Sequence, residues 1–583
     1  MRRTTMKTTK KVIGSFLCVG LVFSSVACTP HGTYVPPTGD STTVEQIDTE
    51  KTQLYVYNFY GGYGSDWLAS LKERFEEAHK DDVWEEGKKG VQIFIHNDKT
   101  QIMTFASQIP ENRDEVYFTE YAYYYTLRSE GVMADITDAL TEPLTEYGES
   151  ESIVDKLSAE QQSFYGVKEE EKTTYYGLPH YSGYSGLIYN VDLFDEEGYY
   201  FAETPLGSSL EDQFVSKYNT KKSVGPDGKS GTSDDGLPAT YEQFFQLCEF
   251  IASNKQTPVT WNGFDNTHYL THLAAAFTAD YEGLDQMMLN YTLGDQEDNV
   301  AADLATIQDG KLVMDSAPME IAEENGYELA RQAGKYYALS FLHQLTTTDR
   351  YHNSLAFNTS FSHTNAQEYF LYAGNDGVTA DAAMLVDGCW WESEANAVFD
   401  TIVASKGDAY SKYNRNFAWM PLPKATSEKV TSAAEAKNPY TLSDEVSSLC
   451  FVKSHIEAWK LPLAKEFIRF AYTDASLSDF TAITNTPKAV DYEMRDEDLA
   501  RMTPFGRSLM EIKNRADIVY PYSTNPTYVN NQSYFGVNDS FYSKLGTSTR
   551  QWPSTAFHDS KYTAEEYFSG MYVYFKESWE TLI

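Results

Sequence analysis

Three aspartates in a glycine-rich segment supply the ligand type that a hard cation prefers. Asp227, Asp234 and Asp235 lie within Asp227–Gly236, which contains too much glycine for a helix. Carboxylate oxygens suit Ca²⁺, which takes about six to eight oxygen ligands. The spacing is not that of an EF-hand, because a lysine and a glycine stand at ligand positions. The segment therefore predicts either a bound Ca²⁺ or an acidic surface loop, and no other cofactor is expected.

Motifs of hydrolytic enzymes are incomplete in this chain. The segment Gly183–Gly186 (GYSG) does not match the G-x-S-x-G motif of a nucleophile turn, because its second glycine directly follows the serine. Neither H-E-x-x-H nor a phosphate-binding loop is present. His268 and His272 could share a helix face as zinc ligands do, but no third ligand is identifiable, so we expect them at the edge of a site. The chain is predicted not to be an enzyme, although its 85 acidic residues leave a glycosidase carboxylate pair open.

Cys28 ends a segment organised like a secretory signal. A basic start leads into the apolar run Val12–Phe23, and the small residues Ser24–Ala27 precede the cysteine. The run is shorter than the ~20 residues that a membrane span needs. The end of the segment resembles the bacterial lipobox, with Ser25 where leucine is usual. The pattern predicts a lipoprotein, the alternative being a plain signal peptide with an incidental cysteine.

This prediction places the protein outside the cytoplasm. Residues 1–27 would be removed, and Cys28 would carry acyl chains, each buried CH₂ contributing about 0.8 kcal/mol to membrane attachment. Residues 28–50 are polar and contain proline, glycine and threonine, so we expect a flexible tether. The expected location is the extracellular side of the bacterial cell membrane, with the body held by its lipid anchor.

Size and charge narrow the possible partners. A chain of 583 residues is expected to form two or three lobes. Its net charge of −39 argues against nucleic acid, which needs clustered lysine and arginine, and against an anionic membrane surface. Beyond the signal and Cys28, the cysteines Cys248, Cys389 and Cys450 do not make a disulfide framework, although one bridge is possible.

Strands and helices alternate in the first part of the folded body. Residues 54–59 are rich in β-formers, and helical spacing of apolar residues follows over 66–79. Strands are also predicted at 91–95 and 116–119, the latter leading into a helix over 121–130. Further on, Thr240 is expected to cap a helix, and 461–472 has an apolar helical face. Alternation of this kind predicts an α/β class with a parallel sheet.

Seven short motifs follow one another along the chain. They are Tyr176–Pro179 (YGLP), Gly186–Phe194 (GLIYNVDLF), Pro238–Glu242 (PATYE), Ala382–Trp390 (AAMLVDGCW), Pro421–Pro423 (PLP), Ala464–Ile468 (AKEFI) and Thr486–Pro487. Their order resembles that of the family 1 extracellular solute-binding proteins of bacterial ABC importers, the group that contains the maltose-binding protein. The resemblance covers roughly residues 52–490, with Tyr241 where the family usually has tryptophan.

The resemblance implies a periplasmic-binding-protein-like fold in which two α/β lobes close over a ligand around a hinge. The first lobe would hold residues 51–182 plus about 440–475, and the second 183–439 plus about 476–583. The implied function is that a monomer captures an extracellular solute and delivers it to importer permease subunits. The solute is expected to be an oligosaccharide. Glycan cleavage and peptide binding are the alternatives.

A sugar site needs aromatic rings for the C–H faces of the ligand and polar groups for its hydroxyl edge. Candidates are expected in loops at the carboxyl ends of strands, where open α/β sheets bind ligands. Tyr60, Gly62 and Tyr63 follow the first strand, where a tight strand–helix turn is the alternative. Glu120 stands at a family position that often contacts ligand, and its alternative is an acid at a helix start.

Other candidates come from the resemblance and from local composition. His180 and Tyr181 lie beside the implied hinge, and hinge packing is the alternative role. Trp390 matches the family tryptophan that stacks on sugars; of Trp390 and Trp391, we expect one in the core and predict that Trp390 lines the cleft. Trp261 is a weaker candidate.

Overall fold

A computed structural model describes residues 45–169, 172–295, 298–373, 382–537, 539–547 and 550–583. The predicted signal peptide, Cys28 and the tether up to residue 44 lie outside these described residues. Residues 45–50 were expected in the tether, but they contact the folded body. Lys72 Nζ lies 2.6 Å from Glu45 Oε1, and the Asp48 amide donates to Gln92 Oε1 at 2.8 Å. The tether prediction is therefore wrong for residues 45–50.

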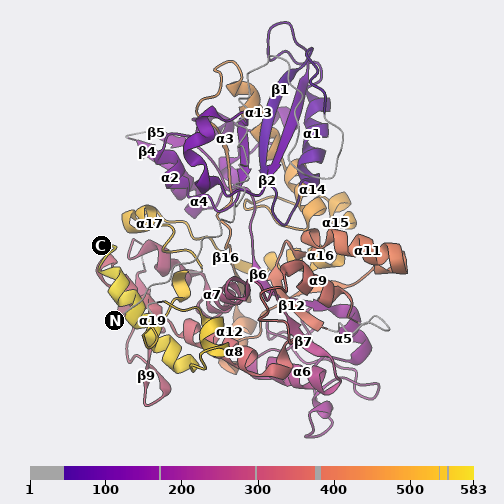
Figure 1. Cartoon of the computed structure of the whole chain (residues 1–583), viewed down its shortest axis with the longest axis vertical. Coiled ribbons are helices and arrows are strands. Elements are labelled where there is room, and N and C mark those ends of the chain that lie inside the picture. The colour runs from indigo at the N-terminus through magenta and orange to yellow at the C-terminus, as the bar shows by residue number, and fades with distance from the viewer. Residues whose placement is uncertain (1–44, 170–171, 296–297, 374–381, 538, 548–549) are drawn as a thin grey trace, which may run out of the picture.

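The first lobe is built on a four-stranded sheet in the order β15–β3–β1–β2 (Figure 1). Its strands are β1 (Thr52–Phe59), β2 (Val91–Asp98), β3 (Val116–Thr119) and β15 (Leu449–Val452). The strand β1 pairs in parallel with β2 and β3, whereas β15 runs antiparallel to β3. All of β3 and β15 is buried, as expected for strands covered on both faces by helices.

The second lobe contains another four-stranded sheet, in the order β13–β6–β12–β7. Its strands are β6 (Ser185–Asn190), β7 (Thr257–Thr260), β12 (Ala382–Gly388) and β13 (Phe417–Met420). The strand β6 is antiparallel to β12 and β13, and β12 is parallel to β7. The α/β class is thus observed, but the expected parallel sheet is correct only in part because both sheets are mixed.

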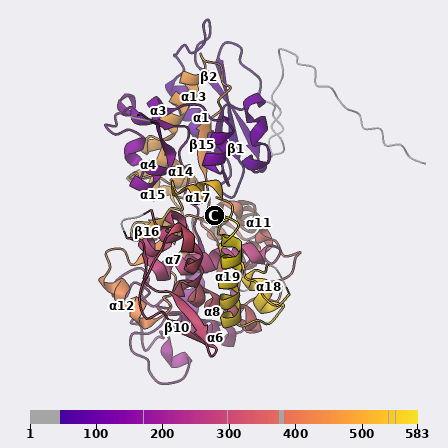
Figure 2. The ribbon, with the colours of Figure 1, turned by 90° about the vertical axis from the view of Figure 1, so that its left-hand side faces the viewer.

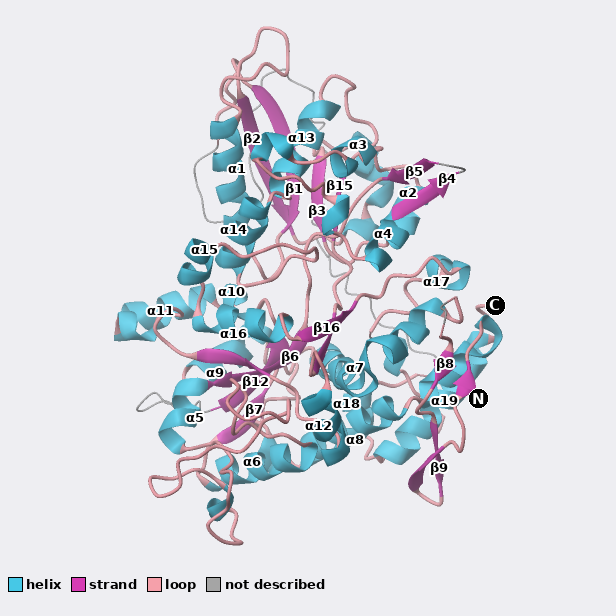
Figure 3. Ribbon diagram, turned by 180° about the vertical axis from the view of Figure 1, so that it is seen from behind, coloured by secondary structure: helices cyan, strands magenta, loops and turns pink. Residues whose placement is uncertain are grey.

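Helices cover both sheets (Figure 3). The first lobe and its junction with the second use α1 (Asp66–Ala78), α2 (Tyr124–Ser129), α3 (Thr137–Thr141), α4 (Ala159–Tyr165), α13 (Leu461–Ala471), α14 (Asp474–Thr484), α15 (Asp496–Arg501) and α17 (Pro526–Asn530). The second lobe uses α5 (Val191–Glu197), α6 (Tyr241–Ser253), α7 (Asn266–Thr292), α8 (Ala333–Thr347), α9 (His363–Leu371), α10 (Trp391–Glu394), α11 (Asn396–Lys406), α12 (Ser427–Glu435), α16 (Pro504–Lys513), α18 (Pro553–His558) and α19 (Ala564–Trp579).

Short strand pairs complete the fold. They are β4 (Gly166–Glu169) with β5 (Lys172–Tyr175), β8 (Val300–Ala301) with β11 (Met319–Glu320), β9 (Ala305–Gln308) with β10 (Lys311–Met314), and β14 (Tyr440–Ser443) with β16 (Ala516–Val519). The C-terminal helix α19 packs beside α8 and α18 in the second lobe (Figure 2). Among the described residues, no helix has both the length and the apolar character that crossing a membrane requires. Cys248, Cys389 and Cys450 are buried and free.

The predicted cap of α6 is present with one difference. Thr240 Oγ1 accepts a hydrogen bond from the Gln243 amide at 3.3 Å, as an N-cap does. The Gln243 side chain, however, accepts from the amide of Ala239 at 2.7 Å rather than from that of Thr240. The first contact occupies an amide that the first turn of the helix leaves without a partner, and the second ties the residue before the cap to that turn, so the local sequence favours the start of α6 here.

Three segments of the described chain connect the lobes, before β6, between β14 and β15, and between α14 and α16. The segments also bond to one another. The Gly183 amide donates to Asp444 Oδ1 at 3.1 Å, and the Ser182 amide donates to the Pro487 carbonyl at 3.0 Å. Hydrogen bonds between crossing segments hold them together as one hinge.

Two lobe boundaries need correction. The strand β14 was expected in the first lobe, but it pairs with β16, and its Tyr440 and Leu442 belong to a second-lobe core with Trp391. Residues from 476 were expected in the second lobe, but α14 packs against α1, where Ser70 Oγ donates to Asp479 Oδ2 at 2.7 Å. The order of the motifs indicates that the chain returns to the first lobe. The residues at which it enters and leaves that lobe are decided by side-chain contacts, which the motifs do not predict.

Candidate ligand-binding site

A cavity of about 640 Å³ lies between the two lobes, and we call it the first cavity. Its volume is within the range of about 300–1,000 Å³ that is usual for small-molecule sites. The residues that line it are Phe59, Tyr60, Gly61, Gly62, Lys99, Gln101, Met103, Glu120, Tyr121, Tyr123, Tyr181, Ser185, Asp265, His268, Tyr269, His272, Val386, Asp387, Gly388, Trp390, Glu394 and Val446. Many of them follow the carboxyl ends of β1, β2, β3 and β12, where α/β sheets bind ligands.

Trp390 sits among three glycines that come from different parts of the fold. A Cβ built on Gly62 would lie 2.7 Å from Trp390 Cβ, one on Gly183 would lie 3.3 Å from Cζ3, and one on Gly388 would lie 2.3 Å from Cζ2. The glycines belong to the loop after β1, a hinge segment and the end of β12. The indole therefore touches both lobes and the hinge, and only residues without a side chain allow this approach. Trp390 also lines the first cavity.

Two other predicted tryptophans lie in the core of the second lobe. Trp391 is fully buried, with its ring centroid 5.6 Å from that of Phe370 and 5.5 Å from that of Phe505. Trp261 is also fully buried, 5.1 Å from the ring of His352. Neither residue lines the first cavity. Trp261 and Trp391 are therefore corrected from candidate ligand contacts to core residues, because neighbouring aromatic rings enclose them. Trp391 is the member of the tryptophan pair that lies in the core, where one of the two was expected.

The loop after β1 and the end of β3 bring other predicted residues to the first cavity. Tyr60 is 38% exposed and offers a ring to the cavity, whereas Tyr63 is buried and packs on Tyr181 with ring centroids 4.6 Å apart. Tyr181 lines the cavity and donates to Glu120 Oε1 at 2.7 Å. Burial raises the pKa of Glu120 to about 8 against the opposing effect of this hydrogen bond. At neutral pH Glu120 is therefore mostly protonated and can donate to a ligand oxygen.

His180 supports the site from beneath instead of lining it. Its ring is fully buried, and Nδ1 accepts from Lys488 Nζ at 2.8 Å. Burial lowers the pKa of His180, with a further contribution from the lysine, and burial also lowers the pKa of Lys488 to about 7. The His180 ring packs on Trp67 and Phe118. The predicted ligand contact at His180 is corrected to core packing next to the hinge.

Tyr121, which directly follows the predicted site residue Glu120, also lines the first cavity. It was expected in a helix, but its φ is +52°, and α2 begins only at Tyr124. A left-handed backbone is strained for a tyrosine, and strain of this kind concentrates at functional sites. The conformation leaves the ring 42% exposed at the first cavity. No residue pattern signals it, because tyrosine is not a type that favours this conformation.

The second lobe adds carboxyl groups that the sequence analysis missed. Gln367 Nε2 donates to Asp387 Oδ2 at 3.2 Å and to Glu394 Oε2 at 3.0 Å, so the two acids lie side by side. Burial raises the pKa of both, and the neighbouring Glu394 further raises that of Asp387. Asp387 lies within the Ala382–Trp390 segment used for the resemblance, which was the available signal. Together with Glu120, these acids provide hydrogen-bonding groups from both lobes.

Both histidines expected at the edge of a site line the first cavity from the start of α7. His268 Nδ1 lies 2.7 Å from Asp265 Oδ2, and His272 Nδ1 lies 2.5 Å from Glu445 Oε2 in the hinge. Each ring is thus oriented by its own carboxylate. Within the described ranges, no group of three or more histidine, cysteine, aspartate or glutamate side chains could hold a metal ion.

The aspartates of the glycine-rich loop are used for internal contacts. Asp227 forms an ion pair with Arg515 and accepts from the Lys229 amide at 2.8 Å. Asp234 accepts from the Asp227 amide at 2.9 Å and from the Tyr440 hydroxyl at 3.0 Å, and Asp235 accepts from the Gly231 amide at 2.7 Å. These contacts engage oxygens of all three aspartates within the chain, and the Ca²⁺ site stays a prediction.

Glu120 gives a prediction for stability against pH. A carboxyl group whose pKa rises on folding binds more protons folded than unfolded, so the free energy of unfolding falls as pH rises from about 5 to 8. Replacing Glu120 by glutamine is expected to make this fall shallower, because its pKa of about 8 no longer contributes. Asp444, also with a pKa raised by burial to about 8, would retain part of the slope. Urea unfolding of both proteins at several pH values measures the free energy of unfolding. Equal slopes of this free energy against pH would contradict the raised pKa assigned to Glu120.

Comparison with known proteins agrees with this architecture. No protein-family model matches the sequence, and no curated protein is significantly similar to it. A solved chitin oligosaccharide binding protein superimposes with a TM-score of 0.50 at 13% identity, covering 91% of this chain and 100% of that one. Apo RafE from Streptococcus pneumoniae gives 0.50 at 13%, covering 91% and 99%. Maltose-bound MalE3 from T. maritima gives 0.50 at 13%, covering 90% and 100%. At this identity the likeness establishes the fold, and it confirms the predicted two-lobed α/β class.

Proposed function

We propose that this protein captures an extracellular oligosaccharide between its lobes and delivers it to the permease subunits of an ABC importer. The observation that carries the proposal is the first cavity, where aromatic rings and polar groups from both lobes converge. Tyr60, Tyr121 and Trp390 supply ring faces, and Glu120, Asp387 and Glu394 supply hydrogen-bonding edges. The proteins with this fold compared above include a chitin oligosaccharide binding protein and a maltose-bound MalE3.

The mechanism that we propose is closure around the hinge. A ligand that bridges groups of both lobes stabilises the arrangement in which those groups face each other, and it shifts the equilibrium by its differential affinity for the two states. The permease would then recognise the ligand-bound arrangement. Lipidation of Cys28 would keep the protein, as a monomer, on the extracellular side of the membrane close to that permease. No catalytic step is part of this proposal.

Glycan cleavage is the second candidate function, since four carboxyl groups line the first cavity and glycosidases use carboxyl pairs about 5–10 Å apart. The buried pair Asp387 and Glu394 favours this candidate more than any other feature.

One experiment separates the candidates. The chain from residue 29 onward is titrated calorimetrically with a panel of oligosaccharides, and every mixture is analysed afterwards for chain length. We expect saturable binding of at least one sugar, which is recovered intact. Shortened sugar would establish the glycosidase instead. Binding of peptides with no response to any sugar would contradict the oligosaccharide assignment.

A further inference from the structure

A second cavity, of about 500 Å³, adjoins the first one. The loop after β1 forms the wall between them, since Tyr60, Gly61 and Gly62 line both cavities, together with Lys99 and Glu394. The remaining wall comes from both lobes, including α11 and the segment after it on one side and α14 and α15 on the other. The two cavities therefore form neighbouring compartments of one space between the lobes, and a long ligand could occupy both.

The charge of the second cavity differs from that of the whole chain. Although the chain carries a net charge of −39, three cations line this cavity: Lys99, Lys412 and Arg501. The acids in the same wall are Asp66 and Glu394, and burial raises the pKa of Glu394, so that its negative charge is reduced. In the described part of the chain, neither Lys99 nor Lys412 forms an ion pair with an acid. Lys412 Nζ instead donates to Asn396 Oδ1 at 2.8 Å.

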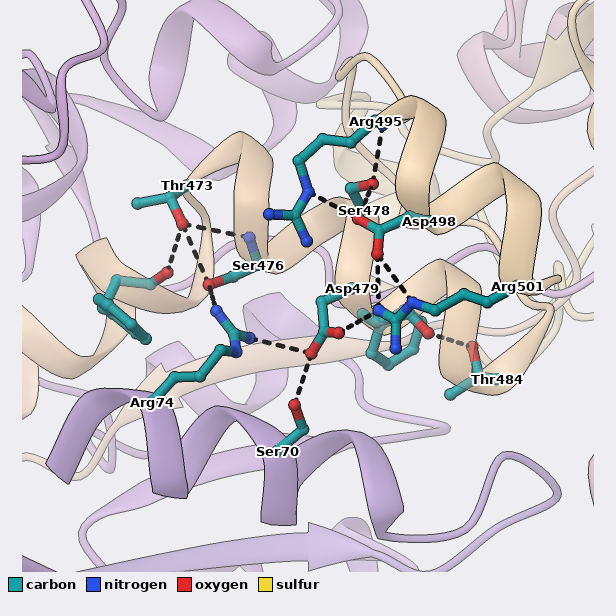
Figure 4. Close-up of polar contacts among 12 residues, drawn as sticks. Ser70, Arg74, Thr473, Ser476, Ser478, Asp479, Thr484, Arg495, Asp498 and Arg501 are labelled. Carbon is teal, nitrogen blue, oxygen red and sulfur yellow. Dashed lines mark hydrogen bonds and ion pairs between the residues drawn. The ribbon is translucent and has the colours of Figure 1, made fainter. Parts of the chain in front are cut away.

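Arg501 is held in place by two acids, Asp498 and Asp479 (Figure 4). Its Nε and Nη2 donate to Asp498 Oδ1 at 2.9 and 2.6 Å, and Nη2 also contacts Asp479. Asp479 is held in turn by Arg74 and Ser70 of α1. Among the described residues, Arg501 Nη1 has no hydrogen-bond partner, and the side chain is 46% exposed. One edge of an immobilised guanidinium is thus open to the second cavity, an arrangement suited to a carboxylate or sulfate oxygen.

An exposed ring completes the wall. Tyr413 follows Lys412 directly, lines the second cavity and is 60% exposed. A ring face next to cationic donors matches a sugar unit that carries an acidic substituent, because the C–H face stacks while the anionic group bonds at the edge. A neutral sugar could not form charge-assisted hydrogen bonds in which both partners are ionised with Lys99 and Lys412, whereas an anionic unit could.

We propose that the second cavity binds an anionic unit of the oligosaccharide, a uronate or a sulfated sugar, with Lys412, Lys99 and Arg501 as its recognition groups. This inference rests on the proposed function and names the ligand class for it. The first cavity would hold the neutral units of the same chain. Ligands would therefore be selected by an acidic group at a fixed distance from the part that contacts Trp390.

The test uses ligand pairs that differ only in charge. Oligogalacturonates are compared with their methyl esters, and sulfated oligosaccharides with their desulfated forms, by calorimetric titration of the chain from residue 29 onward. We expect one acidic series to bind at least about tenfold more tightly than its uncharged partner, as charged hydrogen bonds imply. The carboxylate and sulfate arms identify the anion. Added salt is expected to weaken the binding of the acidic ligand and to leave the binding of its uncharged partner unchanged.

Variants locate the effect. Lys412→Gln removes the charge and keeps a polar side chain that is one atom shorter. It is expected to weaken binding of the acidic ligand about tenfold and to change binding of the uncharged partner less than about twofold. Lys99→Gln provides a second, independent removal of charge. The matched control is Lys406→Gln at the end of α11, where the lysine contacts the rings of Tyr372 and Tyr410 and does not line either cavity.

Equal affinity within each ligand pair, or an equal effect of Lys412→Gln on both members, would overturn this inference and leave the proposed function intact. Absence of binding by every sugar, charged or uncharged, would overturn the proposed function itself. The two failures are thus distinguishable in one set of titrations.

Discussion

Replacing Trp391 by alanine will lower the free energy of unfolding by about 3–5 kcal/mol, the usual cost of removing a large buried aromatic side chain. The indole is fully buried among Phe370, Phe417 and Phe505. These rings come from α9, β13 and α16, so three elements lose a shared contact and cannot all collapse into the space. Urea unfolding followed by circular dichroism measures the change.

The adjacent Trp390 is the matched control, since it has the same chemistry one residue earlier. Trp390→Ala is expected to weaken ligand binding by at least about 1 kcal/mol through loss of a stacking face, while most of the stability remains. For Trp391→Ala, the affinity of the protein that stays folded should change little. If Trp390→Ala unfolded the protein, or left affinity unchanged, Trp390 would be a core residue and not part of the site.

A second large effect is expected from one methyl group. In Gly62→Ala the new Cβ would lie 2.7 Å from Trp390 Cβ, much closer than carbon atoms approach, and Trp390 Cβ cannot move away because it is attached to the backbone. The lobes would have to separate at this point to relieve the overlap. We therefore expect ligand affinity to fall at least about tenfold, or 1.4 kcal/mol, with the thermal unfolding temperature nearly unchanged. Calorimetric titration and a thermal melt check the two halves of this prediction.

Gly536→Ala is the control for Gly62→Ala. Its added Cβ would meet a single backbone oxygen at 3.4 Å, an ordinary contact, and the residue lies away from both cavities. Its affinity should equal that of the parent protein. Small-angle scattering of the ligand-treated proteins adds a structural readout, because the parent should become more compact and Gly62→Ala should not. Full compaction of Gly62→Ala would mean that the contact between Gly62 and Trp390 does not limit closure.

The sequence predicts elements well where the local pattern decides them. The helix starting at Asp66 and the strand at Val116 have clear periodicity, and both occur as expected. It predicts the site less well because exposure depends on tertiary neighbours. Trp390 and Trp391 are alike as sequence, and only the glycines around the first and the phenylalanines around the second separate their environments.

His180 and Tyr121 illustrate two further limits. His180 is of a residue type that can contact a ligand. In the core, however, its ring accepts a hydrogen bond from Lys488, which is distant in the sequence, and no local pattern predicts that pair. Tyr121 continues an apparent helix in sequence, whereas its left-handed backbone depends on the amide of Ala122 donating to the Ser447 carbonyl of the hinge. Such long-range contacts decide the geometry of the site and are invisible to residue spacing.

The discontinuous first lobe has a consequence for the order in which the protein can mature. Its sheet lacks an edge strand until β15 has been made, and α14, which covers α1, ends only at Thr484 of 583 residues. The lobe that begins the chain is therefore completed only after the strands β6, β7, β12 and β13 of the other lobe have been synthesised. Pairing between such distant segments is slow. If the predicted signal segment directs export, the first lobe remains incomplete until β15 and α14 have been made, and an incomplete lobe offers less resistance to passage across a membrane.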